Sequence, residues 1–219
     1  MATHLQTEIE KLKKKILFIG AMVEEALQRA VKAVIDRDAG LALAVIEHDQ
    51  DIDRMEVELE EECLKVLALH QPVAVDLRFI VAILKINNDL ERIGDLAVNI
   101  AGRAEFLARQ DRLAIPYDLA GMAEEVRLML KHSLDALVNL DVVIATQVCR
   151  ADDVVDNMNR QMYKQVMDAI RRDWEHLDAY INMISISRYL ERLADHTTNI
   201  AQDAIYLIEG EIVRHHQRN

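Results

Sequence analysis

The chain has 219 residues, of which 51% are hydrophobic but only 4% aromatic, with 6 glycines and 2 prolines. So few turn residues among so many helix formers exclude a protein built from many short strands and predict long helices. The charge balance, 26 Lys and Arg against 38 Asp and Glu, argues against direct nucleic-acid binding, because such binding depends on neutralising phosphates.

Apolar residues spaced three and four apart, together with breakers, predict six helices. Asp38 is expected to cap the second helix, and Gln71-Pro72 to end it, because proline cannot continue the hydrogen-bond ladder. Helices this long need a shared core, so we expect an all-α fold of two tandem three-helix bundles. The expected ranges, in chain order, are about 5–35, 39–69, 75–109, 120–145, 152–171 and 176–213, with a linker at 110–119.

Three features bear on location and assembly. Cys63 and Cys149 show no metal or redox spacing, so we interpret them as free thiols in a reducing compartment. No stretch of 18 apolar residues occurs, and residues 1–15 do not form a signal peptide pattern, so a cytoplasmic location is expected. The fourth predicted helix carries an apolar face that leaves room for self-association, made of Val126, Met129, Leu130, Leu134 and Leu137.

An internal repeat is the strongest signal in the sequence. The pattern L-E-R-[IL]-x-D-x-x-x-N-I-A at residues 90–101 recurs without a gap at residues 190–201. A weaker match, D-x-x-[IV]-D, links residues 49–53 to residues 152–156 at a slightly larger offset, which a different connection between the second and third helices would explain. These matches predict a tandem duplication, with halves at residues 1–112 and 117–215.

The repeats carry paired acids four residues apart, on one face of each helix. Like charges at this spacing destabilise a helix by about 0.2–0.5 kcal/mol, so their presence in both repeats suggests a bound cation. If the second and third helices of each bundle pack side by side, four carboxylates meet, a ligand set that suits divalent ions or a multinuclear iron or zinc cluster. A surface cluster could leave positions open for an anion such as phosphate. The pairs are Asp49 with Asp53, Glu91 with Asp95, Asp152 with Asp156, and Glu191 with Asp195.

Other interpretations of these acids stay open. A chain this acidic has roughly six or seven such pairs by chance, and we interpret Glu56 with Glu60 and Glu58 with Glu62 as such accidents on a solvated face. Arg92 and Arg192 are expected to pair with acids on neighbouring turns or helices, with attraction of an anion as the alternative. His196 is not supported as a ligand, because its counterpart is Leu96.

No phosphate-binding loop or nucleophile elbow occurs, which indicates a protein that is not an enzyme. The alternatives are a metal-dependent hydrolase or oxidase that uses the same carboxylates, and a helical adaptor without metal.

Several of these motifs resemble one family. L-E-R-I-G-D at residues 90–95, L-E-R-L-A-D-H-T-T-N-I-A at residues 190–201, and His70-Gln71-Pro72 followed by Asp76-Leu77-Arg78 are similar to the PhoU family over nearly the whole chain. The resemblance implies two three-helix bundles whose E/D-x-x-x-D motifs bind multinuclear iron or zinc clusters, with the four pairs above as ligands.

The resemblance also implies a role. It suggests a negative regulator of the phosphate-starvation response and of phosphate uptake. Many members of the family are homodimers, so the resemblance also implies a homodimer. Such a protein would link the ATPase subunit of a phosphate importer to a sensor histidine kinase. Two departures, Ala194 in place of Gly94 and Asn159 in place of Glu56, predict a second cluster that is weaker or differently shaped.

Overall fold

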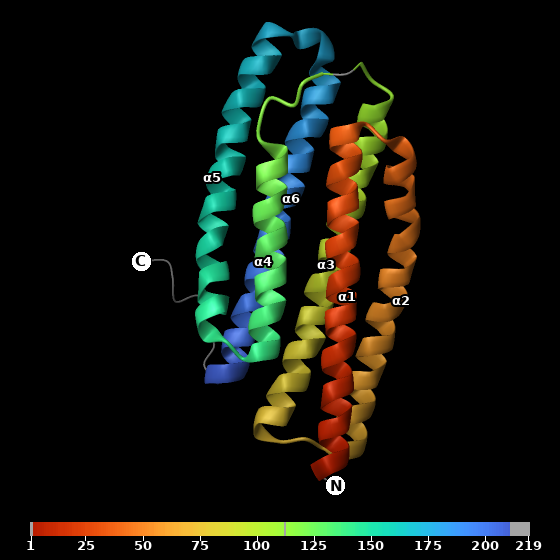
Figure 1. Cartoon of the computed structure of the whole chain (residues 1–219), viewed down its shortest axis with the longest axis vertical. Helices are drawn as coiled ribbons and strands as arrows, with labels where there is room; N and C mark the ends of the chain where they lie inside the picture. Colours follow the sequence, from red (N-terminus) through yellow and green to blue (C-terminus); the bar gives the residue numbers. More distant parts are fainter. Residues whose placement is uncertain (1, 112, 211–219) are drawn as a thin grey trace.

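The computed structural model describes residues 2–111 and 113–210. Each helix runs antiparallel to the next in the chain, so that α1 to α3 form one three-helix repeat and α4 to α6 a second (Figure 1). The predicted all-α fold with two repeats is confirmed. The elements are α1 (Ala2–Asp36), α2 (Ala39–His70), α3 (Ala74–Ala108), α4 (Leu119–Asn139), α5 (Val142–Arg172), the short 3-10 helix η1 (Trp174–His176) and α6 (Leu177–Glu209).

The predicted signals at both ends of α2 are confirmed. The Asp38 carboxylate accepts a hydrogen bond from the backbone N–H of Leu41 at 2.9 Å, which caps the helix. At the other end Gln71 adopts a left-handed conformation, and Pro72 follows it. Residues 71–73 join α2 to α3, whereas Asp173 alone separates α5 from η1. The sequence offset between the repeats changes mainly because α6 begins at Leu177, closer to Glu191 than the start of α3 at Ala74 is to Glu91.

The boundary between the fourth and fifth helices was predicted wrongly. α4 ends at Asn139 and α5 begins at Val142, well before the expected break at residues 145–152. Leu140 is left-handed, and the Asp141 carboxylate accepts hydrogen bonds from the backbone N–H groups of Val143 and Ile144. The apolar spacing continues through both helices, so periodicity alone did not show this break. α6 ends at a left-handed Gly210, and the expected boundaries at residues 112, 213 and 215 lie outside the described residues.

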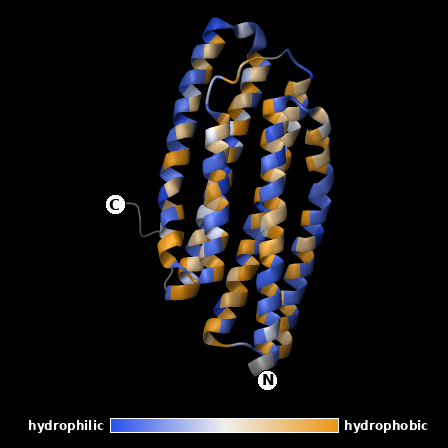
Figure 2. Cartoon of the chain, in the orientation of Figure 1, coloured by the Kyte–Doolittle hydropathy of each residue, from blue (hydrophilic) through white to orange (hydrophobic). Residues whose placement is uncertain are grey.

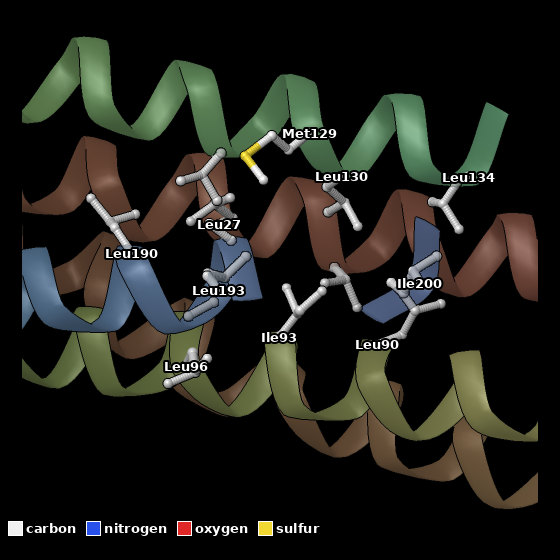
Figure 3. Packing of buried hydrophobic residues seen from close by; sticks show 14 of the residues in the cluster. Leu27, Leu90, Ile93, Leu96, Met129, Leu130, Leu134, Leu190, Leu193 and Ile200 are labelled. Atoms are coloured by element: carbon white, nitrogen blue, oxygen red, sulfur yellow. The ribbon is translucent and has the colours of Figure 1, made fainter. Parts of the chain in front are cut away.

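The apolar stripes of the helices face inward and form one continuous core. Apolar and polar residues follow separate faces along each helix in Figure 2. Side chains from α1, α3, α4 and α6 meet between the repeats in Figure 3, where Ile93 and Leu193 come from equivalent positions of the two repeats. We call the antiparallel contact between α3 and α6 the seam. None of the described helices has both the length and the apolarity needed to cross a bilayer.

The apolar face of α4 lies inside the molecule and not on its outside. Its members are all buried against the other helices, because the two repeats share one core and α4 packs on α1 as well as on α6. The expectation that this face supports self-association is therefore wrong, and a homodimer stays a prediction from the family resemblance alone. The buried members are Val126, Met129, Leu130, Leu134 and Leu137.

Two helical glycines are expected to respond in opposite ways to leucine. A Cβ on Gly20 of α1 would overlap the side chain of Leu134 on α4, whereas a Cβ on Gly102 of α3 meets no atom within 4 Å. Gly102→Leu should stabilise the fold by about 0.5–1 kcal/mol through helix propensity, and Gly20→Leu should cost about 1–3 kcal/mol through overpacking. Urea unfolding followed by circular dichroism measures both. Equal effects of the two substitutions would contradict the close approach of α1 and α4.

Candidate functional site

The predicted acids of the first repeat lie along the contact between α2 and α3, which run antiparallel (Figure 1). Asp49 and Asp53 belong to α2, and Glu91 and Asp95 belong to α3; we call these four residues the first acidic site. The Asp49 carboxylate reaches the backbone of α3, because its Oδ1 lies 3.5 Å from the position that a Cβ on Gly94 would take. A Cβ at Gly94 would make an ordinary van der Waals contact with Asp49, so Asp49 lies close against the turn of α3 that bears Glu91 and Asp95.

The four carboxylates influence one another. The pKa of Asp49 is raised to about 6, mainly because burial disfavours the charged form, and further because Asp53, Asp95 and Glu91 lie near it. Burial also raises the pKa of Glu91, with contributions from Asp95 and Asp53. α2 and α3 thus bring the four predicted side chains to one place. Their role as metal ligands stays a prediction.

The second repeat has the same arrangement. Asp152 and Asp156 on α5 meet Glu191 and Asp195 on α6, and we call these four residues the second acidic site. The pKa of Asp152 is raised to about 6, first by burial and then by the charges of Asp195 and Asp156. Burial followed by nearby carboxylates also raises the pKa values of Glu191 and Asp195. The duplication therefore places two sites of one design in the molecule.

Unsatisfied oxygen atoms lie at both sites. Asn87 Oδ1 and Thr198 Oγ1 are buried and have no hydrogen-bond partner within the described part of the chain. Glu91 Oε2 is also buried and accepts no hydrogen bond there, although Arg92 Nε lies 3.4 Å from it in an ion pair. Thr198 is close enough to Asp152 to lower its pKa, without forming a well-aligned hydrogen bond. A buried polar atom without a partner costs about 1–3 kcal/mol, and such oxygens are the ligands that hard cations prefer. The donor set therefore fits an oxygen-bound cation.

The side chains are not arranged as a finished metal site. In residues 2–111 and 113–210, no three His, Cys, Asp or Glu side chains are grouped so that they could hold a metal ion. Arg92 partly offsets the acidic charge, because its Nη1 lies 3.2 Å from Asp95 Oδ2 and its Nε lies 3.4 Å from Glu91 Oε2. The expected pairing of Arg92 with acids is confirmed. A cation at this site would have to compete with that arginine and draw the carboxylates together.

The two acidic pairs dismissed as accidents differ from each other. Glu58 and Glu62 lie at 3.8 and 2.6 Å from Lys15 Nζ, which accounts for their presence without a bound cation. Glu56 is half-buried, and its backbone carbonyl and carboxylate oxygens accept hydrogen bonds from Asn87. The interpretation of Glu56 as part of a solvated face was therefore wrong. The four-residue spacing of the acids in α2 does not reveal which residues of α3 lie opposite them, and so it did not predict the contact with Asn87.

One polar contact across the seam was not predicted. His196 Nδ1 on α6 lies 2.8 Å from Asp89 Oδ1 on α3, and Asn199 Nδ2 donates a hydrogen bond to the same oxygen at 3.4 Å. Asp89 is buried, so this contact holds the repeats together at a polar point of the seam. The internal repeat gave no signal for it, because the equivalent residues, Tyr189 and Leu96, cannot form the same pair.

The two repeats also correspond to a known domain. A family model described as the PhoU domain matches the chain twice, over residues 16–104 and residues 119–204. The first match falls on α1 to α3 and the second on α4 to α6, so that each acidic site lies within one copy of the domain. The chain belongs to the PhoU family.

Similarity to individual PhoU proteins extends over nearly the full chain. A protein of Pseudomonas aeruginosa, named a phosphate-specific transport system accessory protein PhoU homolog, is 36% identical over 216 residues, covering 98% of this chain and 89% of its own. A homolog of the same name from Aquifex aeolicus is 38% identical over 208 residues, covering 95% and 94%. Both are PhoU proteins named for accessory roles.

Two crystal structures of PhoU proteins have the same fold. The PhoU structure from Pseudomonas aeruginosa matches with a TM-score of 0.90 at 36% identity, covering 94% of this chain and 99% of the other. A structure from Streptococcus pneumoniae, described as the phosphate transport system regulatory protein PhoU, matches with a TM-score of 0.89 at 28% identity, covering 95% and 99%. The arrangement of the α-helices in the described part of the chain is therefore the PhoU fold.

The raised pKa of Asp49 predicts a pH-dependent effect of Asp49→Asn in this PhoU protein. The folded pKa of about 6 lies above the unfolded value, so the folded state binds the proton more tightly. That stabilisation is complete below about pH 4 and is lost as the pH rises through 6. In chelator at pH 7.5, Asp49→Asn should therefore stabilise the fold by about 1 kcal/mol, after allowance for solvent screening.

The gain from Asp49→Asn should disappear at pH 4, which urea titrations at the two pH values measure. Asp51→Asn is the control, because the Asp51 side chain is 46% exposed, pairs with Arg54 and is not among the groups that raise the pKa of Asp49. Its effect should stay within about 0.5 kcal/mol at both pH values. A gain from Asp49→Asn that is the same at pH 4 and pH 7.5 would contradict a raised pKa.

Proposed function

We propose that this chain is a cytoplasmic negative regulator of the phosphate-starvation response and of phosphate uptake. The observation that carries the proposal is the match to the PhoU domain in both repeats, together with relatives named as phosphate-specific transport system accessory proteins. The regulator works by protein–protein contacts with the ATPase subunit of a phosphate importer and with a sensor histidine kinase. Its two free cysteines, Cys63 and Cys149, agree with a reducing compartment.

We further propose that each acidic site binds a multinuclear iron or zinc cluster. Asp49, Asp53, Glu91 and Asp95 would hold it in the first repeat, and the second acidic site would hold it in the second. Support comes from the shared position of the carboxylates and from the buried oxygens without partners beside them. A bound cluster supplies positive charge that offsets the repulsion between the acids and leaves coordination positions for an anion such as phosphate.

The regulatory role is tested by complementation. In a strain that lacks the chain, a phosphate-starvation reporter should be active in phosphate-rich medium, and the wild-type chain should silence it. The variant Glu91→Gln/Asp95→Asn/Glu191→Gln/Asp195→Asn should fail to silence it if the metal sites serve regulation. The control Glu58→Gln/Glu62→Gln makes the same kind of charge change at a site paired with Lys15 and should silence normally. A reporter that stays inactive without the chain would refute the proposed role.

The contacts and the absence of catalysis need separate tests. Purified wild-type chain should bind the purified ATPase subunit and the cytoplasmic part of the kinase, and binding to neither would refute the linking role. The rival enzyme is tested with phosphate esters and the metal-loaded chain. Turnover that Glu91→Ala abolishes would establish a hydrolase in place of a regulator that is not an enzyme.

A further inference from the structure

A polar contact extends the first acidic site by one further turn. Asn87 Nδ2 on α3 donates hydrogen bonds to the backbone oxygen of Glu56 at 2.9 Å and to its Oε1 at 3.2 Å. Asn87 is only 1% exposed, so its amide head lies between α2 and α3 and not in solvent. Glu56 follows Asp53 by three residues on α2, and Asn87 precedes Glu91 by four on α3. Glu56 therefore continues the row of acids on the same helix face.

Glu56 also lies within the electrostatic field of the first acidic site. Burial raises its pKa, and nearby Glu60, Glu91 and Asp53 raise it further. Two of these three acids belong to the site. Asn87 therefore holds the half-buried Glu56 carboxylate beside two members of the site, through one hydrogen bond to that carboxylate and one to the Glu56 backbone oxygen.

The amide that holds Glu56 is itself incompletely satisfied. Asn87 Oδ1 is buried and has no hydrogen-bond partner in the described residues, although the side chain is almost wholly excluded from water. A buried amide oxygen without a hydrogen-bond partner is costly in a protein without a ligand. Asn87 Oδ1 has lone pairs to donate, so it could bind a cation directly or accept a hydrogen bond from water bound to that cation.

The second repeat keeps the contact but lacks the charge. Ser187 Oγ donates a hydrogen bond to Asn159 Oδ1 at 2.8 Å. Asn159 stands in α5 at the place that Glu56 has in α2, three residues after Asp156, and Ser187 stands at the place of Asn87. The two repeats therefore have the same interhelical contact, with a carboxylate in the first and an amide in the second. Aligning the two repeats shows that Asn159 replaces Glu56, but it does not show that these residues contact Ser187 and Asn87.

We propose that Glu56 is a fifth carboxylate ligand of the first acidic site, oriented by Asn87, and that the first site consequently binds cations more tightly than the second. The inference rests on the proposed binding of metal at these sites. An added carboxylate raises the negative charge and the number of oxygen ligands, which are the quantities that set the affinity of an oxygen-liganded cation site. Asn87 is a positioning residue, because it acts through Glu56.

The test measures Zn²⁺ binding to the full chain by competition with a chromophoric chelator, with zinc per chain measured by mass spectrometry. Glu191→Gln/Asp195→Asn silences the second site, so this parent reports the first site alone. In that parent Glu56→Gln should weaken zinc binding by roughly 10–100-fold. The matched control is Glu60→Gln, which removes the same charge one turn further along α2 from an exposed position and should change affinity less than about threefold.

A double-mutant cycle tests the positioning by Asn87. Asn87→Ser, the residue of the second repeat, should weaken zinc binding, but it should have no further effect once Glu56→Gln is present. Additive losses would show that Asn87 acts only through the general packing of α2 and α3. Circular dichroism and thermal melts in chelator must show that each variant keeps its helices.

The outcomes separate this inference from the proposed function. If Glu56→Gln has no effect, or if Glu60→Gln weakens binding equally, Glu56 is not a ligand although the sites still bind metal. If the parent binds no zinc while the mirror variant Glu91→Gln/Asp95→Asn does, the second site is the stronger one and the inference is wrong. If neither the parent nor the mirror variant binds zinc, both the proposed metal sites and the inference about Glu56 are refuted.

Discussion

Zinc added to the metal-free wild-type chain should raise its thermal midpoint by roughly 5–10 °C for each occupied site. Free zinc at a hundredfold excess over its dissociation constant contributes about 2.7 kcal/mol to the free energy of unfolding. For a chain of about this size, 1 kcal/mol corresponds to roughly 2–4 °C. Burial, and after it the charges of neighbouring acids, raises the pKa values of Asp49 and Asp152. A bound cation would relieve the repulsion between these acids and so stabilise the folded state.

The size of the zinc effect should follow the number of intact sites. Glu91→Gln/Asp95→Asn should keep only the contribution of the second site, and the same change at Glu191 and Asp195 should keep only the first. The control Glu58→Gln/Glu62→Gln should respond like wild type, because those acids pair with Lys15 and belong to neither acidic site. Differential scanning fluorimetry with zinc, and with Fe²⁺ under anaerobic conditions, makes the measurement. No shift with either ion would refute the proposed metal sites.

Leu193→Ala should produce the other large effect, a loss of about 2–5 kcal/mol in the free energy of unfolding. Leu193 lies on α6 at the seam and is fully buried among side chains of both repeats (Figure 3). Truncation removes apolar surface from the core and leaves a cavity that the helices on both sides can fill only partly. The thermal midpoint in chelator should fall by roughly 5–15 °C.

An exposed leucine provides the comparison. Leu64 on α2 is 53% exposed, so Leu64→Ala should change the free energy of unfolding by less than about 0.5 kcal/mol. The same urea titration also shows whether the repeats unfold together. Because Leu193 contacts the core shared by both repeats, a single transition is expected for wild type and variant. A small loss at Leu193, comparable with that at Leu64, would contradict a core that is continuous across the seam.

The sequence predicted the local features of the fold well and the contacts between helices poorly. The caps at Asp38 and the break at Gln71-Pro72 were correct, because a cap or a proline acts within one turn of the chain. The break at Leu140 was missed, since one left-handed residue interrupts helices whose apolar spacing continues across it. Within the candidate site, the eight acids were identified from the repeat, whereas the partner of Glu56 was not.

The sequence by itself determined that the chain is helical, that it is duplicated and that each copy carries acids four residues apart, because periodicity and self-similarity are properties of the chain alone. Only the tertiary structure decided which side of α4 is inside, and that Glu56 meets Asn87 while His196 meets Asp89. The physical reason is that helical spacing specifies a face but not what lies opposite it. That is decided when two repeats bury their apolar faces in a single core.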